Sequence, residues 1–200
     1  MDSILGILGA ARMRRFATAM GLPALGFAAS VVLAEQALIP DKSEVVYVTT
    51  QMGAPVDGGF SRFEAHVDLD PKRLQSSSIG FAVDTSSVVF PSDDVVKELA
   101  KPGWLDSAHF PKAEFKSSRI RDLGGRRYEV AGTLTIKGHA SEIVFPISLS
   151  QSGSTTFATG VLTIKRLQFG IGQGEWSDTS LVADDVQIKF KIALSGVGPL

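Results

Sequence analysis

The chain has 200 residues, 44% of them hydrophobic and 20% charged, and this composition excludes an intrinsically disordered protein. Its 20 basic and 21 acidic residues give a net charge of −1, which argues against a nucleic-acid-binding protein, because such proteins carry a surplus of cations that neutralises phosphates. It has no cysteine, which excludes disulfide scaffolds, thiolate zinc sites, iron–sulfur clusters, covalently attached haem and a cysteine nucleophile.

Residues 1–34 are predicted to be a signal peptide. Three arginines within positions 12–15 precede an uncharged stretch over 16–33, and the small and apolar residues that end at Ala34 fit a secretory cleavage site. We therefore expect cleavage after Ala34. Because two arginines follow Met13 directly, we hypothesise that the natural start is Met13.

An uncleaved membrane anchor is the alternative for this segment. Its 18 uncharged residues approach the lower limit for a helix that spans a bilayer. Gly21, Pro23 and Gly26 weaken that alternative because they destabilise a helix. Cleavage is the preferred interpretation, and it leaves one domain over 35–200.

Apolar and polar residues alternate with a period of two through most of the remaining chain, a pattern that predicts β-strands. From Phe63 to Leu69 every odd position is apolar and every even position is polar. The same pattern predicts eight strands, at 44–52, 58–70, 77–84, 112–122, 126–137, 140–150, 154–168 and 185–196.

Glycines are expected to mark turns between these strands. We predict positive-φ turns at 57–59 and 124–125, and a tight hairpin at 137–138. Gly132 and Gly160 fall inside predicted strands, where a glycine indicates a bend or the close approach of another group.

One stretch, 92–100, breaks the alternation. Ser92 is a suitable N-cap, Asp93 and Asp94 belong to a first helical turn, and apolar residues follow at helical spacing, so a short helix is predicted.

The predicted fold is all-β: an eight-stranded antiparallel barrel with a short helical insertion. Eight strands enclose an interior that is either filled by side chains or holds one small apolar ligand. The sequence leaves a two-sheet sandwich and a barrel with a solid core open as alternatives.

Few residues point to catalysis or metal binding. The chain has three histidines, and we expect His66 and His139 to be solvated, whereas His109 lies in an irregular segment. There is no nucleophile elbow and no histidine pair with metal-ligand spacing. We predict no catalytic site, no metal and no cofactor.

Two features near the end of the seventh predicted strand admit both a functional and a structural interpretation. Residues 170–174 are glycine-rich but lack the lysine and the helix of a phosphate-binding loop, so a flexible loop is the better interpretation. Lys165 and Arg166 lie beside Phe169 and Trp176, where a cation could receive a polar head group at the mouth of a barrel. The alternative is a solvated strand end.

Several segments together resemble the YceI-like family of bacterial periplasmic lipid-binding proteins. They follow the family's order and cover nearly all of 38–196. The segments that carry the resemblance are 51–56, 59–63, 70–71, 104–115, 127–138 and 169–176.

The resemblance implies a lipocalin-like barrel with a helical insertion that holds a polyisoprenoid, or a quinone with an isoprenoid tail, in an apolar tunnel. The forms at 51–53 and 169–176 are similar to a subgroup associated with a b-type membrane cytochrome, which makes quinone handling the sharper expectation. Residues 88–91 depart from the family's usual sequence, so the loop contacts there are not transferred.

Two functional hypotheses follow, both with a periplasmic location. The first is a non-catalytic carrier, with Arg166 and Trp176 at the ligand's head group. The residues expected to line its tunnel are Phe63, Val67, Phe81, Val83, Phe115, Val130, Leu134, Phe145, Ile188 and Phe190. The second is a quinone-linked accessory protein of a b-type cytochrome in electron transfer or oxidative stress. The sequence leaves a homodimer open.

Overall fold

The computed structural model describes residues 36–200. The predicted signal peptide, its cleavage site and the hypothesised start at Met13 lie outside the described residues.

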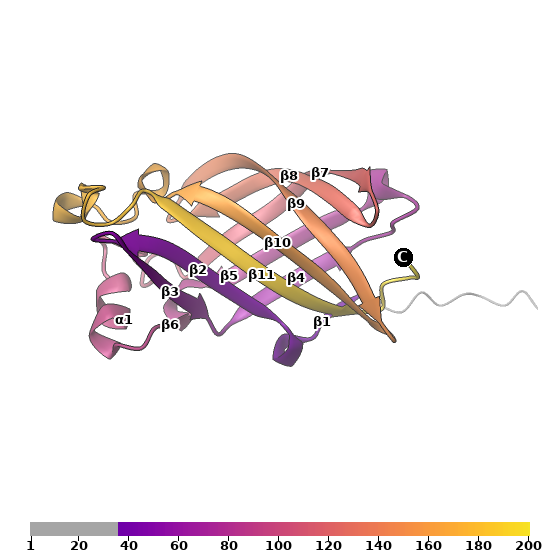
Figure 1. Ribbon diagram of the computed structural model, residues 1–200, viewed down its shortest axis with the longest axis horizontal. Coiled ribbons are helices and arrows are strands. Elements are labelled where there is room, and N and C mark those ends of the chain that lie inside the picture. Colours follow the sequence, from indigo (N-terminus) through magenta and orange to yellow (C-terminus); the bar gives the residue numbers. More distant parts are fainter. Residues whose placement is uncertain (1–35) are drawn as a thin grey trace, which may run out of the picture. The chain divides into compact units, whose positions relative to one another are not determined.

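The described part of the chain is a single antiparallel sheet with one α-helix (Figure 1). The strands are β1 (Ala37–Leu38), β2 (Glu44–Gln51), β3 (Ala54–Phe60), β4 (Phe63–Asp68), β5 (Ser78–Asp84), β6 (Val88–Val89), β7 (Lys112–Gly124), β8 (Arg127–Ile136), β9 (His139–Ser152), β10 (Thr155–Lys165) and β11 (Asp185–Ser195). The helix is α1 (Asp93–Leu99), and short 3-10 turns are η1 (Pro40–Lys42), η2 (Leu74–Ser76), η3 (Thr85–Ser87), η4 (Arg166–Phe169) and η5 (Gly174–Ser177). No helix among residues 36–200 has the length and apolarity needed to cross a membrane.

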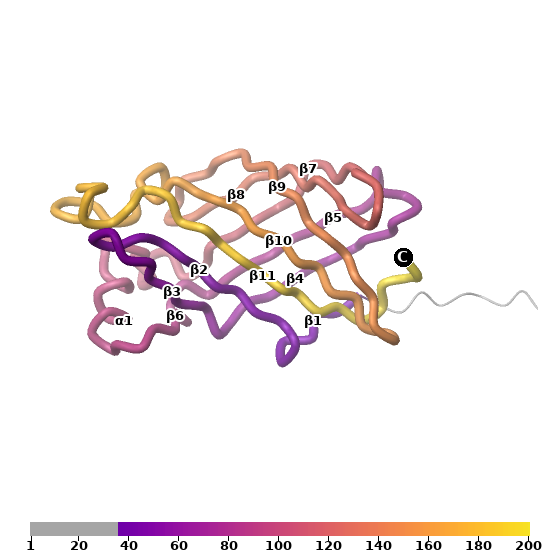
Figure 2. The backbone as a smooth tube through the Cα atoms, in the orientation of Figure 1, coloured from indigo at the N-terminus to yellow at the C-terminus, as the bar shows by residue number. Residues whose placement is uncertain are grey.

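The sheet curls into a barrel. β4 lies at one end of the pairing order and β3 lies near the other end, yet the two strands are consecutive in the chain, which brings the ends of the sheet together. The order is β4-β5-β7-β8-β9-β10-β11-β2-β3-β6, with β1 paired to β11, and every pair is antiparallel. β3 runs directly into β4, so one kinked segment pairs with β2 at its first half and with β5 at its second (Figure 2). The lipocalin-like barrel is thus confirmed, and the two-sheet sandwich is wrong.

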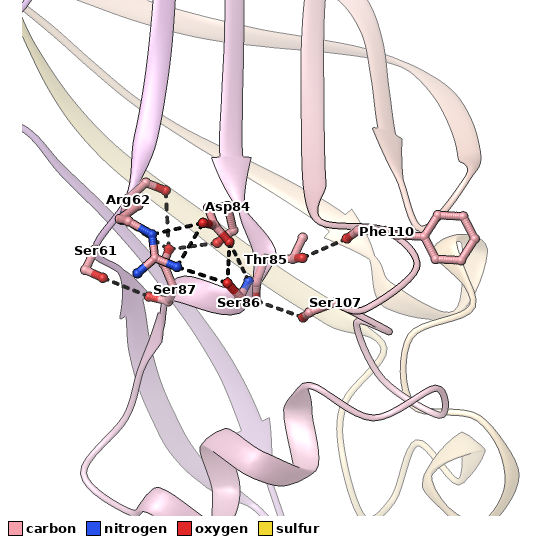
Figure 3. A network of polar contacts seen from close by, with 8 residues as sticks. All are labelled: Ser61, Arg62, Asp84, Thr85, Ser86, Ser87, Ser107 and Phe110. Carbon is pink, nitrogen blue, oxygen red and sulfur yellow. Dashed lines mark hydrogen bonds and ion pairs between the residues drawn. The ribbon is translucent and has the colours of Figure 1, made fainter.

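A network of polar contacts holds the kink between β3 and β4 (Figure 3). The Ser61 amide donates to the Ser87 carbonyl at 2.9 Å, and the Asp84 amide donates to the Arg62 carbonyl at 3.0 Å. The Arg62 side chain also bonds Asp84, with 2.9 Å between Nε and Oδ2. These bonds replace the strand-to-strand hydrogen bonds that are missing where the chain changes from pairing with β2 to pairing with β5.

All eight predicted strands have a counterpart, with one division and two additions. The predicted strand 58–70 divides at 61–62, because its halves pair with different neighbours. β1 and β6 were not predicted, since two-residue strands are too short to show an alternating pattern. The helix predicted over 92–100 is present as α1, with Ser92 at its N-cap position.

Two of the three turn predictions are confirmed and one is wrong. Gly124 and Gly125 have φ of 79° and 63°, and the hairpin at Lys137 and Gly138 has φ of 50° and 77°. The turn expected at 57–59 is instead at 52–53, where φ is 47° and 81°.

Gly58 lies within β3, and a neighbouring side chain, not a turn, explains why this position is a glycine. It pairs with Tyr47 on β2, and a Cβ at this position would overlap the Tyr47 hydroxyl and lie 2.9 Å from Cε1. The missing side chain makes room for the tyrosine ring on the inner face of the barrel.

Candidate ligand-binding cavity

The interior of the barrel encloses a cavity of about 360 Å³. A cavity needs only about 10–15 Å³ to hold one water molecule, so this is far larger than a packing defect. Side chains from the long strands, from α1 and from the segments after α1 and β10 line it. Only two of the lining residues are charged, Glu98 and Arg166. Such a cavity suits an apolar ligand with a small polar part.

The structure places eleven of the twelve predicted ligand-binding residues in the cavity wall. Contact with a ligand stays a prediction for each of them. The eleven are Val67, Phe81, Val83, Phe115, Val130, Leu134, Phe145, Arg166, Trp176, Ile188 and Phe190.

Phe63 is not among the lining residues. Its ring stacks on that of Phe81, with 5.7 Å between the ring centroids and 29° between the planes. Phe63 also packs with the smaller core cluster around Val45 and Ile192. It therefore packs against a lining residue without lining the cavity itself.

Three phenylalanines form a contact chain across the wall. The ring centroids of Phe115 and Phe145 are 5.3 Å apart, and those of Phe145 and Phe190 are 6.0 Å apart, both in edge-to-face geometry. The expected close approach at Gly132 and Gly160 is confirmed. A Cβ at Gly132 would lie 2.7 Å from Phe115 Cζ, and one at Gly160 would lie 2.9 Å from Phe190 Cε1.

Sequence reasoning missed part of the wall. Val45, Tyr47 and Thr49 line the cavity from β2, but Val46 and Val48 between them are apolar too, so no alternation in the sequence indicates which face is inward. Val95, Leu99 and Trp104 were also missed, because α1 and the turn after it carry no strand pattern that indicates an inner face.

Arg166 is buried, with 1% of its surface exposed, so a solvated strand end is wrong for this residue. Burial lowers its pKa, and nearby Asp184 acts in the opposite direction. Its guanidinium donates to five backbone carbonyls, which uses all five N–H groups. The acceptors, with their distances from the arginine nitrogens, are Ala183 (3.0 Å), Ile171 (2.9 Å), Gly172 (3.0 Å), Trp176 (2.6 Å) and Val182 (2.7 Å).

The glycine-rich segment 170–174 wraps around this guanidinium. Gly172 has φ of 72°, and a Cβ there would overlap Arg166 Nη1. The amides of Gly172 and Gln173 both donate to the Gly103 carbonyl, at 2.8 and 2.9 Å. The segment therefore turns carbonyl groups towards a cation, and the amides of Gly172 and Gln173 already donate to Gly103. A phosphate-binding loop does the reverse, because it points free amides at an anion.

Two tryptophans lie beside Arg166. The ring centroids of Trp104 and Trp176 are 5.6 Å apart, and the Arg166 guanidinium carbon is 6.0 Å from the Trp104 centroid. Lys165, in contrast, is exposed and pairs with Asp185 at 2.6 Å. Arg166 therefore meets the ring of Trp104, which was not the expected aromatic residue, and the backbone carbonyl of Trp176, and its guanidinium has no hydrogen-bond donor left for a head group.

The histidines lie away from this cavity wall. His66 and His139 are exposed, as predicted. His109 is also exposed, and its Nδ1 lies 2.8 Å from Asp106 Oδ1. Within residues 36–200 no three His, Cys, Asp or Glu side chains gather in a way that could hold a metal ion.

Figure 1 shows α1, the β2–β3 hairpin and the segment after β10 at one end of the barrel. The Met52 amide donates to the Leu181 carbonyl at 2.8 Å, and Gln51 forms an isolated bridge with Val182. Met52 is 73% exposed and Leu181 is 39% exposed. This end therefore carries exposed apolar side chains next to the cavity's lining residues Gln51 and Val182.

Comparison with known proteins identifies the family. Residues 37–194 match the YceI-like domain. The crystal structure of Burkholderia cenocepacia BcnA is 41% identical, with a TM-score of 0.75 over 78% of this chain and 98% of that chain. A UPF0312 protein of Vibrio cholerae is 26% identical over 141 residues, which are 66% of this chain and 75% of the relative. A domain from Saccharophagus degradans, described as polyisoprenoid-binding and implicated in plant cell wall breakdown, has the same fold, with a TM-score of 0.64 over 80% of this chain and 98% of that domain at 14% identity. The chain belongs to the YceI-like family.

Proposed function

We propose that this protein is a non-catalytic carrier that holds one polyisoprenoid or isoprenoid quinone inside its barrel. The observation that carries the proposal is the cavity, whose wall is almost entirely aliphatic and aromatic. Each buried methylene of a ligand contributes about 0.8 kcal/mol, so a long hydrocarbon chain is bound tightly without any reaction chemistry. The polyisoprenoid-binding description of the Saccharophagus degradans domain supports the same ligand class.

A defined lipid tests this proposal. The purified protein is mixed with phosphatidylcholine vesicles that contain menaquinone-4, the vesicles are removed, and the quinone left with the protein is measured by absorbance. We expect saturation near one quinone per chain. Protein that extracts no quinone at any ratio contradicts the carrier function.

We also propose that the carrier works in the periplasm. The proposal is supported by the predicted signal peptide over 1–34 and the basic residues before its apolar stretch. Expression of the full chain in a Gram-negative host, followed by osmotic release and N-terminal sequencing, tests it. A mature protein that begins at Glu35 is expected, and uncut protein in the cytoplasm contradicts the proposal.

A membrane b-type cytochrome is the proposed partner, with a second copy of the chain as the alternative. The segments that resemble the cytochrome-associated subgroup are 51–53 and 169–176. Hydrogen bonds of Met52 and Arg166 hold them at the same end of the barrel. A photo-crosslinking residue at Met52 tests this, with the same residue at Val144, 60% exposed on β9, as the matched control. Crosslinking to a cytochrome from Met52 alone supports the proposal, whereas crosslinking to a second copy favours the homodimer.

A further inference from the structure

Two hydrogen-bond donors in the cavity wall have no acceptor within the described protein. Among the buried side-chain nitrogen and oxygen atoms of residues 36–200, those without a hydrogen-bond partner are Trp104 Nε1 and Tyr47 Oη. Both residues line the cavity. Buried polar groups in folded proteins are nearly always paired, so two such atoms in one wall call for an explanation.

The rest of the wall does not share this property. Gln51 lies at the hairpin end, and both Gln51 and Trp176 are partly exposed to solvent. The other polar and charged lining side chains bond within the protein: Thr49 to Asp185, Thr85 to Phe110, Glu98 to Lys101, and Arg166 to the five carbonyls.

Trp104 is the more constrained of the two donors. It is 9% exposed, and an indole N–H donates but never accepts a hydrogen bond. The buried cation of Arg166 lies 6.0 Å from its ring centroid and has no N–H left to offer. The surroundings of Trp104 Nε1 therefore favour a neutral ligand group whose electronegative atom accepts a hydrogen bond.

Tyr47 Oη is fixed over Gly58 by the pairing of β2 with β3. Burial, with a smaller effect of Asp57, raises the pKa of Tyr47 to about 12. The hydroxyl therefore keeps its proton at neutral pH and is available as a donor.

The chemistry of the wall selects among head groups. A phosphate would need a cation with free donors, and those of Arg166 are used. A hydroxyl can accept one of these hydrogen bonds, but its own proton then needs an acceptor, and of the two unpaired groups only the Tyr47 oxygen can supply one. A carbonyl oxygen accepts hydrogen bonds, brings no donor and carries no net charge.

We propose that Trp104 and Tyr47 are the polar anchors of this cavity, and that they select isoprenoids with carbonyl-bearing heads over isoprenoid hydrocarbons. The inference rests on the proposed carrier function and adds the class of head group. It also assigns the polar contact to residues other than Arg166.

Two probes test the selection: the isoprenoid ketone geranylgeranylacetone and the isoprenoid hydrocarbon squalene. The Kd of each is measured by partition between the full chain and phosphatidylcholine vesicles. We expect Trp104→Phe and Tyr47→Phe each to weaken ketone binding about tenfold and to change squalene binding less than about twofold, because each removes a donor and keeps the ring. Tyr128→Phe, at a buried tyrosine outside the wall, is the matched control and is expected to change neither.

The ratio of the two affinities separates a lost hydrogen bond from lost packing, since a packing defect weakens both probes. The chain has two tryptophans, so the ¹H–¹⁵N spectrum offers a second readout in two indole signals. We expect the ketone, and not squalene, to shift the Trp104 indole proton downfield. An unchanged ratio in both variants overturns the inference and leaves the carrier function standing, whereas a wild-type protein that binds neither probe overturns both.

Discussion

The ring of Phe115 on β7 lies over Gly132 on β8, so close that a Cβ at Gly132 would come within 2.7 Å of Phe115 Cζ. The same Cβ would overlap the Lys116 carbonyl oxygen, which belongs to the backbone and cannot rotate away. Phe115 in turn contacts Phe145, so this glycine sets the position of a side chain in the cavity wall.

Gly132→Ala is therefore expected to lower the free energy of unfolding by about 1–3 kcal/mol, as overpacking in a filled core does. Urea denaturation measures the effect. Gly103→Ala is the control, because no heavy atom lies within 4 Å of a Cβ at that position, and its change is expected to stay within about 0.5 kcal/mol. Equal stability of the two variants would show that Phe115 is not held against Gly132.

Arg166→Met is expected to destabilise the protein by about 3–5 kcal/mol, because it leaves five backbone carbonyls without their donor. Thermal and urea unfolding at neutral pH measure it. Lys165→Met removes only an exposed ion pair and is expected to cost at most about 1 kcal/mol. A similar small loss in both variants would mean that the carbonyls of 171–183 rearrange without the guanidinium.

Because of Tyr47, the free energy of unfolding is expected to depend on pH under alkaline conditions. Its pKa is about 12 in the folded protein and about 10 in the unfolded chain, so the folded state holds the proton more tightly. The resulting stabilisation is fully present below pH 10 and is lost as the pH rises through 12. Between pH 9 and 12 we expect the wild-type protein to lose up to about 2 kcal/mol more of its free energy of unfolding than Tyr47→Phe loses, as measured by urea denaturation. Identical pH profiles of the two proteins would contradict this.

Ala158→Phe is expected to reduce menaquinone-4 binding at least about tenfold, because Ala158 lines the cavity and a larger side chain there takes up ligand volume. Vesicle partition measures it. Ala140→Phe, exposed on β9, is the matched control and is expected to leave binding unchanged. If the two variants bind equally well, the ligand does not occupy this part of the barrel.

The alternation along the strands was sufficient to predict most of the strands and eleven residues of the wall, because one face of every long strand is buried. The runs that contain Val67, Leu134 and Ile188 show this directly. Phe63 follows the same pattern but lies at the kink, where the strand changes partner, and its ring packs on Phe81 without lining the cavity.

The polar part of the site depends on tertiary contacts that no local pattern carries. Gly58 was predicted to lie in a turn, because the contact with Tyr47 across the sheet that explains this glycine is visible only in the structure. Arg166 was predicted to contact a head group, with a solvated strand end as the alternative, because its five acceptors come from residues 171–183, beyond its own strand. Trp104 was identified only as part of a motif, since its missing acceptor is visible only once its surroundings are known.

The most direct test of the carrier function is native mass spectrometry of the mature protein purified gently from cells, followed by organic extraction and identification of the released lipid. We predict a protein with one isoprenoid of defined mass, released on denaturation and carrying a carbonyl-bearing head. A protein at the mass of the bare chain, which also takes up no isoprenoid when one is added, would contradict the account.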